Sequence, residues 1–214
     1  QHHHREHLQG SGLIERSSTD VWAPAIDRDF LEQPASFRKW WPRLGDKFSV
    51  YGASYLRPPA HPIALDRALE DGESFEWKGF RLTGISTPGH SPGHMAYLIE
   101  RDGKTIAFTG GHFHDGAKFS TWFDSEWDYG FGKGIDALLE STDRLITRKP
   151  ELAFPSHGPP IEQATRQLET FKEKLTVFRA SYLRGYPVHK KKPDEADGYS
   201  NATTFPLLNQ VTPH

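Results

Sequence analysis

The sequence contains no cysteine among its 214 residues. This absence excludes disulfide bonds, thiolate metal ligands and a cysteine nucleophile. Any metal site in this chain must therefore draw its ligands from imidazole and carboxylate side chains. Without cysteines, the sequence leaves the redox compartment and the localisation undetermined.

Long apolar runs and an excess of positive charge are also lacking. No stretch approaches the roughly 18 consecutive apolar residues of a membrane-spanning helix, and the mean hydropathy is −0.67. Lysine and arginine number 26 against 28 acidic residues, and they are spread along the chain. Phosphate neutralisation needs a concentrated basic face. We therefore expect a soluble protein that acts on a small molecule and binds neither nucleic acid nor a membrane.

Alternating apolar residues and turn-forming residues predict an α+β chain in which strand pairs precede strand and helix alternation. Lys78-Gly79 and Asp102-Gly103 are typical hairpin turns. The expected strands cover residues 21–24, 73–86, 95–100, 105–109 and 151–156, and the expected helices cover 27–41, with Asp27 as its cap, 131–148 and 159–183. Residues 1–183 form one predicted domain, and residues 184–214, with Lys190 to Lys192, form an irregular surface tail.

The first candidate site is the segment from His2 to His7, which reads H-x-H-x-E-H. Two histidines separated by one residue can direct their imidazoles at one ion, and the adjacent Glu6-His7 pair can serve a second. A remnant of a histidine tag is the alternative interpretation. Glu6-His7 and Gly10 do not fit a tag, so the pattern favours metal ligands.

Two further histidine motifs follow predicted strands. In TPGHSPGH, residues 87–94, two Pro-Gly turns fix the backbone on either side of His90. We predict that His90 is a ligand and that His94 has a supporting or structural role. In PSHGPP, residues 155–160, His157 lies between a strand and a helix, where the alternative is a purely structural turn. Its position favours a third ligand loop.

The three motifs in this order resemble the histidine motifs of the metallo-β-lactamase superfamily, over residues 1 to about 180. The resemblance implies a four-layer αβ/βα sandwich. It also implies two groups of metal ligands, the first being His2, His4 and His90 and the second Glu6, His7 and His157. Glu6 stands where the family has aspartate, and it would orient or deprotonate the attacking water.

The function implied by this resemblance is metal-dependent hydrolysis, in which a metal-bound hydroxide attacks a small ester, lactone, thioester, amide or phosphoester. Nitrogen and oxygen ligands without thiolates make zinc the default, as one or two ions, although iron or manganese tolerates the same ligands. Two alternatives stay open: a redox enzyme with a single iron, which the family also includes, and a binding protein with a degraded metal site.

The chain departs from the family pattern at two places. Gly111 stands where the family has a metal-bridging aspartate. Either one position binds metal weakly or not at all, or His112, His114 or Asp115 replaces the missing carboxylate. The chain also starts directly on the first motif, where the family has strands before it. We expect a separate N-terminal fragment or a partner chain to supply these strands and complete the sheet.

Aromatic residues are concentrated in the loop from His112 to Gly132, which includes Trp122, Trp127 and Phe131. One interpretation is an aromatic wall over the metal site that selects the substrate. The other is an insert that packs into the core.

Overall fold

A six-stranded sheet forms the centre of the molecule. The computed structural model describes residues 1–34, 59, 61–119 and 133–184. The strands follow one another in sequence order across the sheet, and every neighbouring pair is antiparallel except β6 and β7, which are parallel. They are β3 (Ser74–Trp77), β4 (Phe80–Ser86), β5 (Met95–Arg101), β6 (Lys104–Gly110), β7 (Leu152–Pro155) and β8 (Ile161–Glu162).

Both predicted hairpins are confirmed. β3 pairs with β4 around Lys78-Gly79, and β5 pairs with β6 around Asp102-Gly103. All four turn residues have positive φ, between 48° and 81°. Two consecutive residues in this region form the tight hairpin turn that matches the right-handed twist of the strands. These short turns fix the register, so the opposite ends of β4, β5 and β6 deliver the site loops to one edge.

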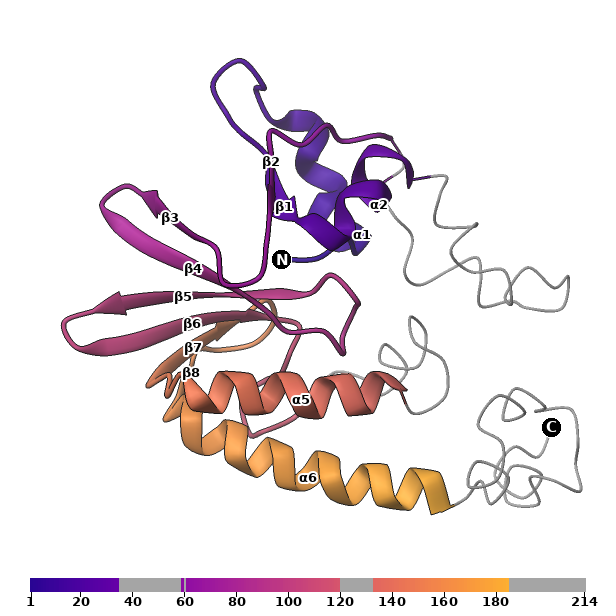
Figure 1. Cartoon of the computed structure of the whole chain (residues 1–214), viewed down its shortest axis with the longest axis vertical. Helices are drawn as coiled ribbons and strands as arrows, with labels where there is room; N and C mark the ends of the chain where they lie inside the picture. Colours follow the sequence, from indigo (N-terminus) through magenta and orange to yellow (C-terminus); the bar gives the residue numbers. More distant parts are fainter. Residues whose placement is uncertain (35–58, 60, 120–132, 185–214) are drawn as a thin grey trace, which may run out of the picture.

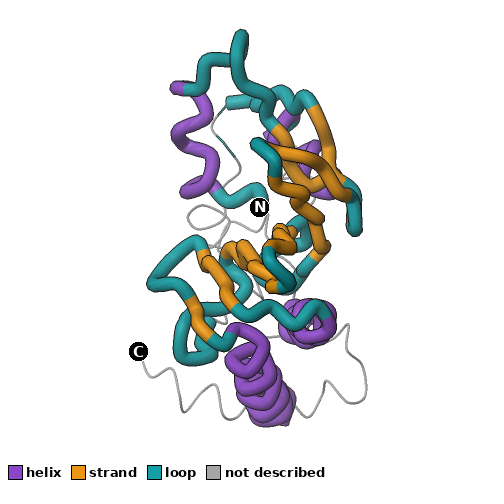
Figure 2. Tube along the Cα trace, turned by 90° about the vertical axis from the view of Figure 1, so that its left-hand side faces the viewer, coloured by secondary structure: helices purple, strands orange, loops and turns teal. Residues whose placement is uncertain are grey.

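Two long helices cover one face of this sheet. Helix α5 (Lys133–Thr147) and helix α6 (Ala164–Arg184) pack on each other, and Figures 1 and 2 show them on the opposite side of the sheet from the N-terminal elements. Their apolar residues and those of the strands form one core. It comprises Ile85, Ala96, Leu98, Ala107, Phe113, Ala117, Leu138, Leu145, Ala153, Ile161, Ala164, Leu168, Phe171 and Leu175.

The N-terminal elements form a smaller unit. A short helix α1 (Arg5–Leu8) runs into the 3-10 turn η1 (Gln9–Leu13). Strand β1 (Trp22–Pro24) pairs in parallel with β2 (Arg67–Leu69), and between them lie the 3-10 turn η2 (Ala25–Asp27) and helix α2 (Arg28–Glu32). The α+β sandwich is thereby confirmed. The expectation that a further segment adds strands stays a prediction.

Three predicted elements need correction. The helix expected over 27–41 ends at Glu32, before Gln33 and Pro34, and its continuation from residue 35 lies outside the described residues. Asp27 makes no side-chain cap on that helix, because its carboxylate is bonded to His3 instead. The helix expected from Pro159 begins only at Ala164, since Ile161 and Glu162 first form β8 along β7. Strand β2 was not predicted.

Candidate metal centre

The N-terminal segment is attached to the sheet through Gln1. Its carbonyl oxygen accepts a hydrogen bond from the Met95 N–H at 2.9 Å. Its side-chain amide donates to the Phe108 carbonyl and accepts from the Ser156 hydroxyl, both at 3.0 Å. Gln1 thus joins the start of β5, the end of β6 and the loop after β7. These are the places from which the other motif residues project.

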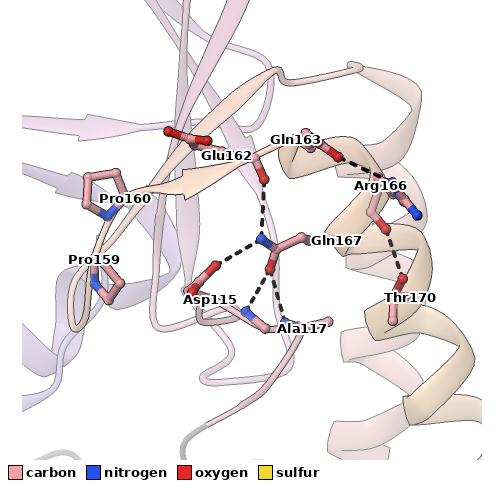
Figure 3. A pocket seen from close by; sticks show the side chains of 10 residues that line it. Asp115, Ala117, Pro159, Pro160, Glu162, Gln163, Arg166, Gln167 and Thr170 are labelled. Atoms are coloured by element: carbon pink, nitrogen blue, oxygen red, sulfur yellow. Dashed lines mark hydrogen bonds between the residues drawn. The ribbon is translucent and has the colours of Figure 1, made fainter.

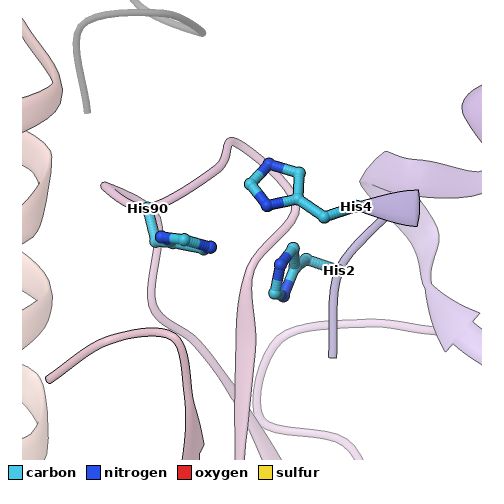
Figure 4. Close-up of side chains that lie close together, drawn as sticks. All are labelled: His2, His4 and His90. Atoms are coloured by element: carbon cyan, nitrogen blue, oxygen red, sulfur yellow. The ribbon is translucent and has the colours of Figure 1, made fainter. Parts of the chain in front are cut away.

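Three histidines meet beside this attachment. The ring nitrogens of His2, His4 and His90 lie within 4.8 Å of one another, and Figure 4 shows the three rings turned toward a common space. The ring centroids of His2 and His4 are 4.3 Å apart, and each lies 4.7 Å from that of His90. His2 and His4 are buried, and His90 is partly buried. The structure therefore brings together the first predicted ligand group.

The three imidazoles are neutral near pH 7. Burial is the main reason that the pKa of each lies well below the usual 6.5, and repulsion from neighbouring histidines adds to it. A neutral imidazole offers a nitrogen lone pair, the form in which histidine binds a metal. Both ring nitrogens of His2 are buried without a hydrogen-bond partner, which is costly unless another group binds them. The donor set thus fits a cation.

His94 supports this group from behind. Its Nε2 accepts a hydrogen bond from the Gly111 N–H at 3.2 Å, so the proton is on Nδ1, which lies 2.8 Å from the Thr87 hydroxyl and 3.1 Å from its carbonyl oxygen. The ring is fully buried. It fixes the loop of His90 against the end of β6, in agreement with the supporting role predicted for it.

Position 111 faces the ring of His90. A Cβ atom on Gly111 would lie 2.7 Å from the Nε2 atom of His90. Any side chain at this position would therefore point into the site, as expected for the position that carries a bridging carboxylate in the family. Glycine has no side chain that could bind a metal, and the His90 ring packs directly against its backbone.

The histidines of the second predicted ligand group, His7 and His157, lie further apart than those of the first. The ring centroids of His7 and His157 lie 6.1 Å apart, and both residues are exposed. His7 is also 4.5 Å from the ring of His2, so it lies between the two groups. Glu6 belongs to α1, but its side chain lies outside the described part of the structure. Its roles as ligand and as base stay predictions.

The three residues considered as replacements for the missing carboxylate do not join the three-histidine group. His112 is buried and bonded through Nε2 to the Thr142 hydroxyl at 3.0 Å. His114 donates from Nδ1 to the His157 carbonyl at 3.0 Å. Asp115 accepts a hydrogen bond from Gln167 of α6 at 2.9 Å. Each is held by a neighbouring element, and His114 also contacts His157, a predicted ligand.

A cavity of about 610 Å³ lies between the loop of Asp115, the Pro159-Pro160 pair and the start of α6. Figure 3 shows Gln167 at its centre, bonded to Asp115, to the backbone N–H of Ala117 and to the Glu162 carbonyl. The Arg166 guanidinium is the one basic group in its lining. The predicted aromatic wall over residues 122–131 lies outside the described residues.

Acid should destabilise the metal-free protein through His112. Burial lowers the pKa of His112 to about 3 from 6.5, so the unfolded state binds a proton over this interval and the folded state does not. Stability is therefore complete above about pH 6.5 and decreases as the pH falls toward 3. The amide of Gln in the His112→Gln variant can still donate to Thr142. Between pH 6.5 and about 4, we expect this variant to lose roughly 3 kcal/mol less of its free energy of unfolding than the wild type loses.

Urea unfolding at several pH values measures this difference, with His61→Gln as the control because His61 is exposed. Parallel pH profiles for the wild type and His112→Gln would contradict it.

Several residues of the site were missed in the sequence. Gln1 and the pair of His3 with Asp27 support the ligand segments through contacts that span 24 to 155 residues. No local pattern marks such partners. The sequence does carry a signal for His3. In an extended segment, successive side chains point to opposite sides, so His3 is expected to point away from the side on which His2 and His4 lie.

The sequence and the structure of this chain are similar to those of known proteins. A family model described as metallo-beta-lactamase superfamily matches residues 2–157, which span all three histidine motifs. The atrochrysone carboxyl ACP thioesterase of Aspergillus fumigatus is 24% identical over 156 residues, 71% of this chain and 44% of that protein. The hydroxyacylglutathione hydrolase of Brucella anthropi is 38% identical over 63 residues, 28% of this chain and 24% of that protein.

Among solved structures, a metallo-beta-lactamase family protein from Thermus thermophilus has a TM-score of 0.57 and 25% identity, with 82% of this chain and 59% of that chain covered. The matched regions cover less than half the length of each of these two curated relatives. Among the described residues, no helix has the length and apolar character needed to cross a membrane.

Proposed function

Because the chain belongs to the metallo-beta-lactamase superfamily, we propose that it is a zinc-dependent hydrolase of a small-molecule substrate. The observation that carries this proposal is the convergence of His2, His4 and His90, three neutral imidazoles whose ring nitrogens lie within 4.8 Å of one another. Three nitrogen donors with no thiolate suit zinc, and a catalytic zinc site needs three protein ligands and one open position.

The metal would supply Lewis acidity, which polarises the carbonyl of the substrate and makes water nucleophilic near neutral pH. The chain supplies the rest. His2, His4 and His90 bind through lone pairs that their low pKa values keep free of protons. His94 keeps the loop of His90 in register with Gly111.

We assign a second, weaker position to His7 and His157, together with Glu6. The ring centroids of His7 and His157 are 6.1 Å apart. Both residues are exposed, so a substrate can reach this position with less movement of the surrounding protein than a buried pair would require. Glu6 is assigned as the proton acceptor for the attacking water from its place in the motif, two residues after His4. Its longer side chain reaches further than the aspartate of the family.

We favour thioesters among the possible substrates. One curated relative is named as a thioesterase acting on an acyl carrier protein, and another as a hydrolase of hydroxyacylglutathione. Both names describe the cleavage of an acyl group from a carrier thiol. The exposed face at His7 and His157 is compatible with a carrier that stays outside while its acyl group enters.

Zinc removal and readdition test this proposal. Metal-free protein should hydrolyse no member of a panel of thioesters, esters, lactones, amides and phosphoesters, and zinc should restore activity, first of all on thioesters. Elemental analysis of the reconstituted protein should give at least one zinc per chain. Hydrolysis that continues unchanged in the metal-free protein, or a reconstituted protein without zinc, would overturn the proposal.

A redox enzyme with one iron is the second candidate, and Gly111 is the observation that favours it. Glycine leaves the position facing His90 without a donor, which favours one metal over two. One iron per chain, with oxygen consumption and no hydrolysis, would support this candidate over the first.

A further inference from the structure

A buried carboxylate lies behind the metal centre. Asp27 and His3 are both fully buried, and Oδ1 of Asp27 lies 3.2 Å from Nδ1 of His3. The carboxylate oxygen can only accept, so Nδ1 of His3 carries the proton. Burying a carboxylate costs several kcal/mol before its partners compensate, so apolar packing would serve a purely structural contact better.

His3 is the residue between two ligands. His2 and His4 turn their rings toward His90, and His3 is bonded to Asp27 instead. The His3 ring also packs against Phe30 of α2, with 4.7 Å between the ring centroids. Holding the middle residue of the three fixes the backbone from which both ligands project.

Asp27 also touches the segment that carries the third ligand. A Cβ atom on Gly93 would overlap the carboxylate of Asp27, so the backbone of the loop after His90 packs directly on it. Gly93 is the second glycine of the TPGHSPGH motif, and only a residue without a side chain permits this approach. The carboxylate of Asp27 thus contacts both segments that carry the ligands. Asp27 belongs to η2, which directly follows strand β1 in the sequence, and β1 is held in place by its pairing with β2.

We propose that Asp27, acting through His3 and Gly93, is a positioning residue that sets the placement of His2 and His4 relative to His90 and thereby the affinity for the metal. This inference rests on the proposed metal site. Outer partners of metal ligands typically change metal affinity by about 10- to 100-fold when they are replaced. Asp27 is one step further from the metal than such partners, since it holds the backbone of the ligands.

Zinc titration of metal-free protein against a chromophoric chelator tests the proposal. We expect Asp27→Ala to raise the Kd for zinc by about 10-fold or more and to change the visible absorption of the cobalt-substituted protein, which reports on ligand geometry. Asp27→Asn keeps an acceptor oxygen for His3 but loses the charge, so it should also raise the Kd for zinc, though less than Asp27→Ala does. Asp20→Asn, at an exposed position, should match the wild type.

The outcomes separate this proposal from the function on which it rests. A wild-type chain that binds no zinc would overturn both. Wild-type binding together with an unchanged Kd and cobalt spectrum in folded Asp27→Ala would overturn the positioning role alone. If Asp27→Ala does not fold, Asp27→Asn decides, because it keeps the volume of the side chain: weaker binding at an unchanged Tm supports the proposal, and the wild-type Kd overturns it.

Discussion

Replacing His90 by alanine should remove zinc from the three-histidine group and reduce hydrolysis roughly a thousandfold, a loss of about 4 kcal/mol in transition-state stabilisation. His90 is the one ligand of this group that the loop between β4 and β5 supplies. Two imidazoles from a single N-terminal segment then remain, which leaves a zinc ion one protein ligand short of a catalytic site. Zinc content by elemental analysis and kcat/KM on the preferred substrate measure the effect.

The fold should survive this substitution. The His90 ring contacts the other histidines and the backbone of Gly111 and does not belong to the apolar core. An unchanged Tm of the metal-free variant would therefore show that the loss arises at the metal. His61→Ala, at an exposed position, is the control. Full zinc content and activity in His90→Ala would refute the ligand assignment.

The sequence predicted the first ligand group because its members carry local marks. His2 and His4 stand two residues apart, and His90 lies between two Pro-Gly pairs directly after a strand. Short hairpins fixed the strands that lead to these loops, and positive φ at Lys78 and Asp102 follows from the turn sequences. Such features depend on neighbours in the chain, so they can be read without knowing the tertiary structure.

Asp27 shows why other parts of the site were not predicted. Its sequence position, at the start of a predicted helix, is typical of a helix cap, yet its carboxylate is bonded to His3, 24 residues away. A burial site and a long-range partner override the local preference for capping, because an unpaired buried carboxylate costs more than a missing cap. The same applies to β2, whose three residues form a strand only through pairing with β1.

Helix boundaries were wrong for a related reason. Pro159 is a suitable first residue for a helix, but Ile161 is fully buried and pairs with Ala153 of β7. Extending the sheet by this short strand buries Ile161 and satisfies backbone groups beside β7. The helix begins after Gln163, which has a positive φ of 51° and turns the chain into α6.

Gly89, the residue before His90, is where the ligand loop meets helix α5. Its φ is +133°, which residues with side chains rarely adopt. A Cβ atom at this position would lie 2.6 Å from the Cα of Leu138 and 2.7 Å from its backbone nitrogen. The neighbouring Pro88 carbonyl accepts a hydrogen bond from Ser141 of the same helix at 2.6 Å. The loop and the helix therefore have no space between them for a methyl group.

Gly89→Ala should consequently lower the free energy of unfolding by about 3 kcal/mol or more, because backbone strain and overpacking each contribute about 1–3 kcal/mol. The helix backbone cannot rotate away as a side chain can, so the loop must shift and carry His90 with it. Urea unfolding measures the first effect, and zinc titration measures the second as a higher Kd. Gly103→Ala is the matched control: its φ is +75° and a Cβ there meets nothing within 4 Å, so it should lose only the strain of about 1–2 kcal/mol. Equal losses in the two variants would show that contact with α5 does not hold the loop of His90 in place.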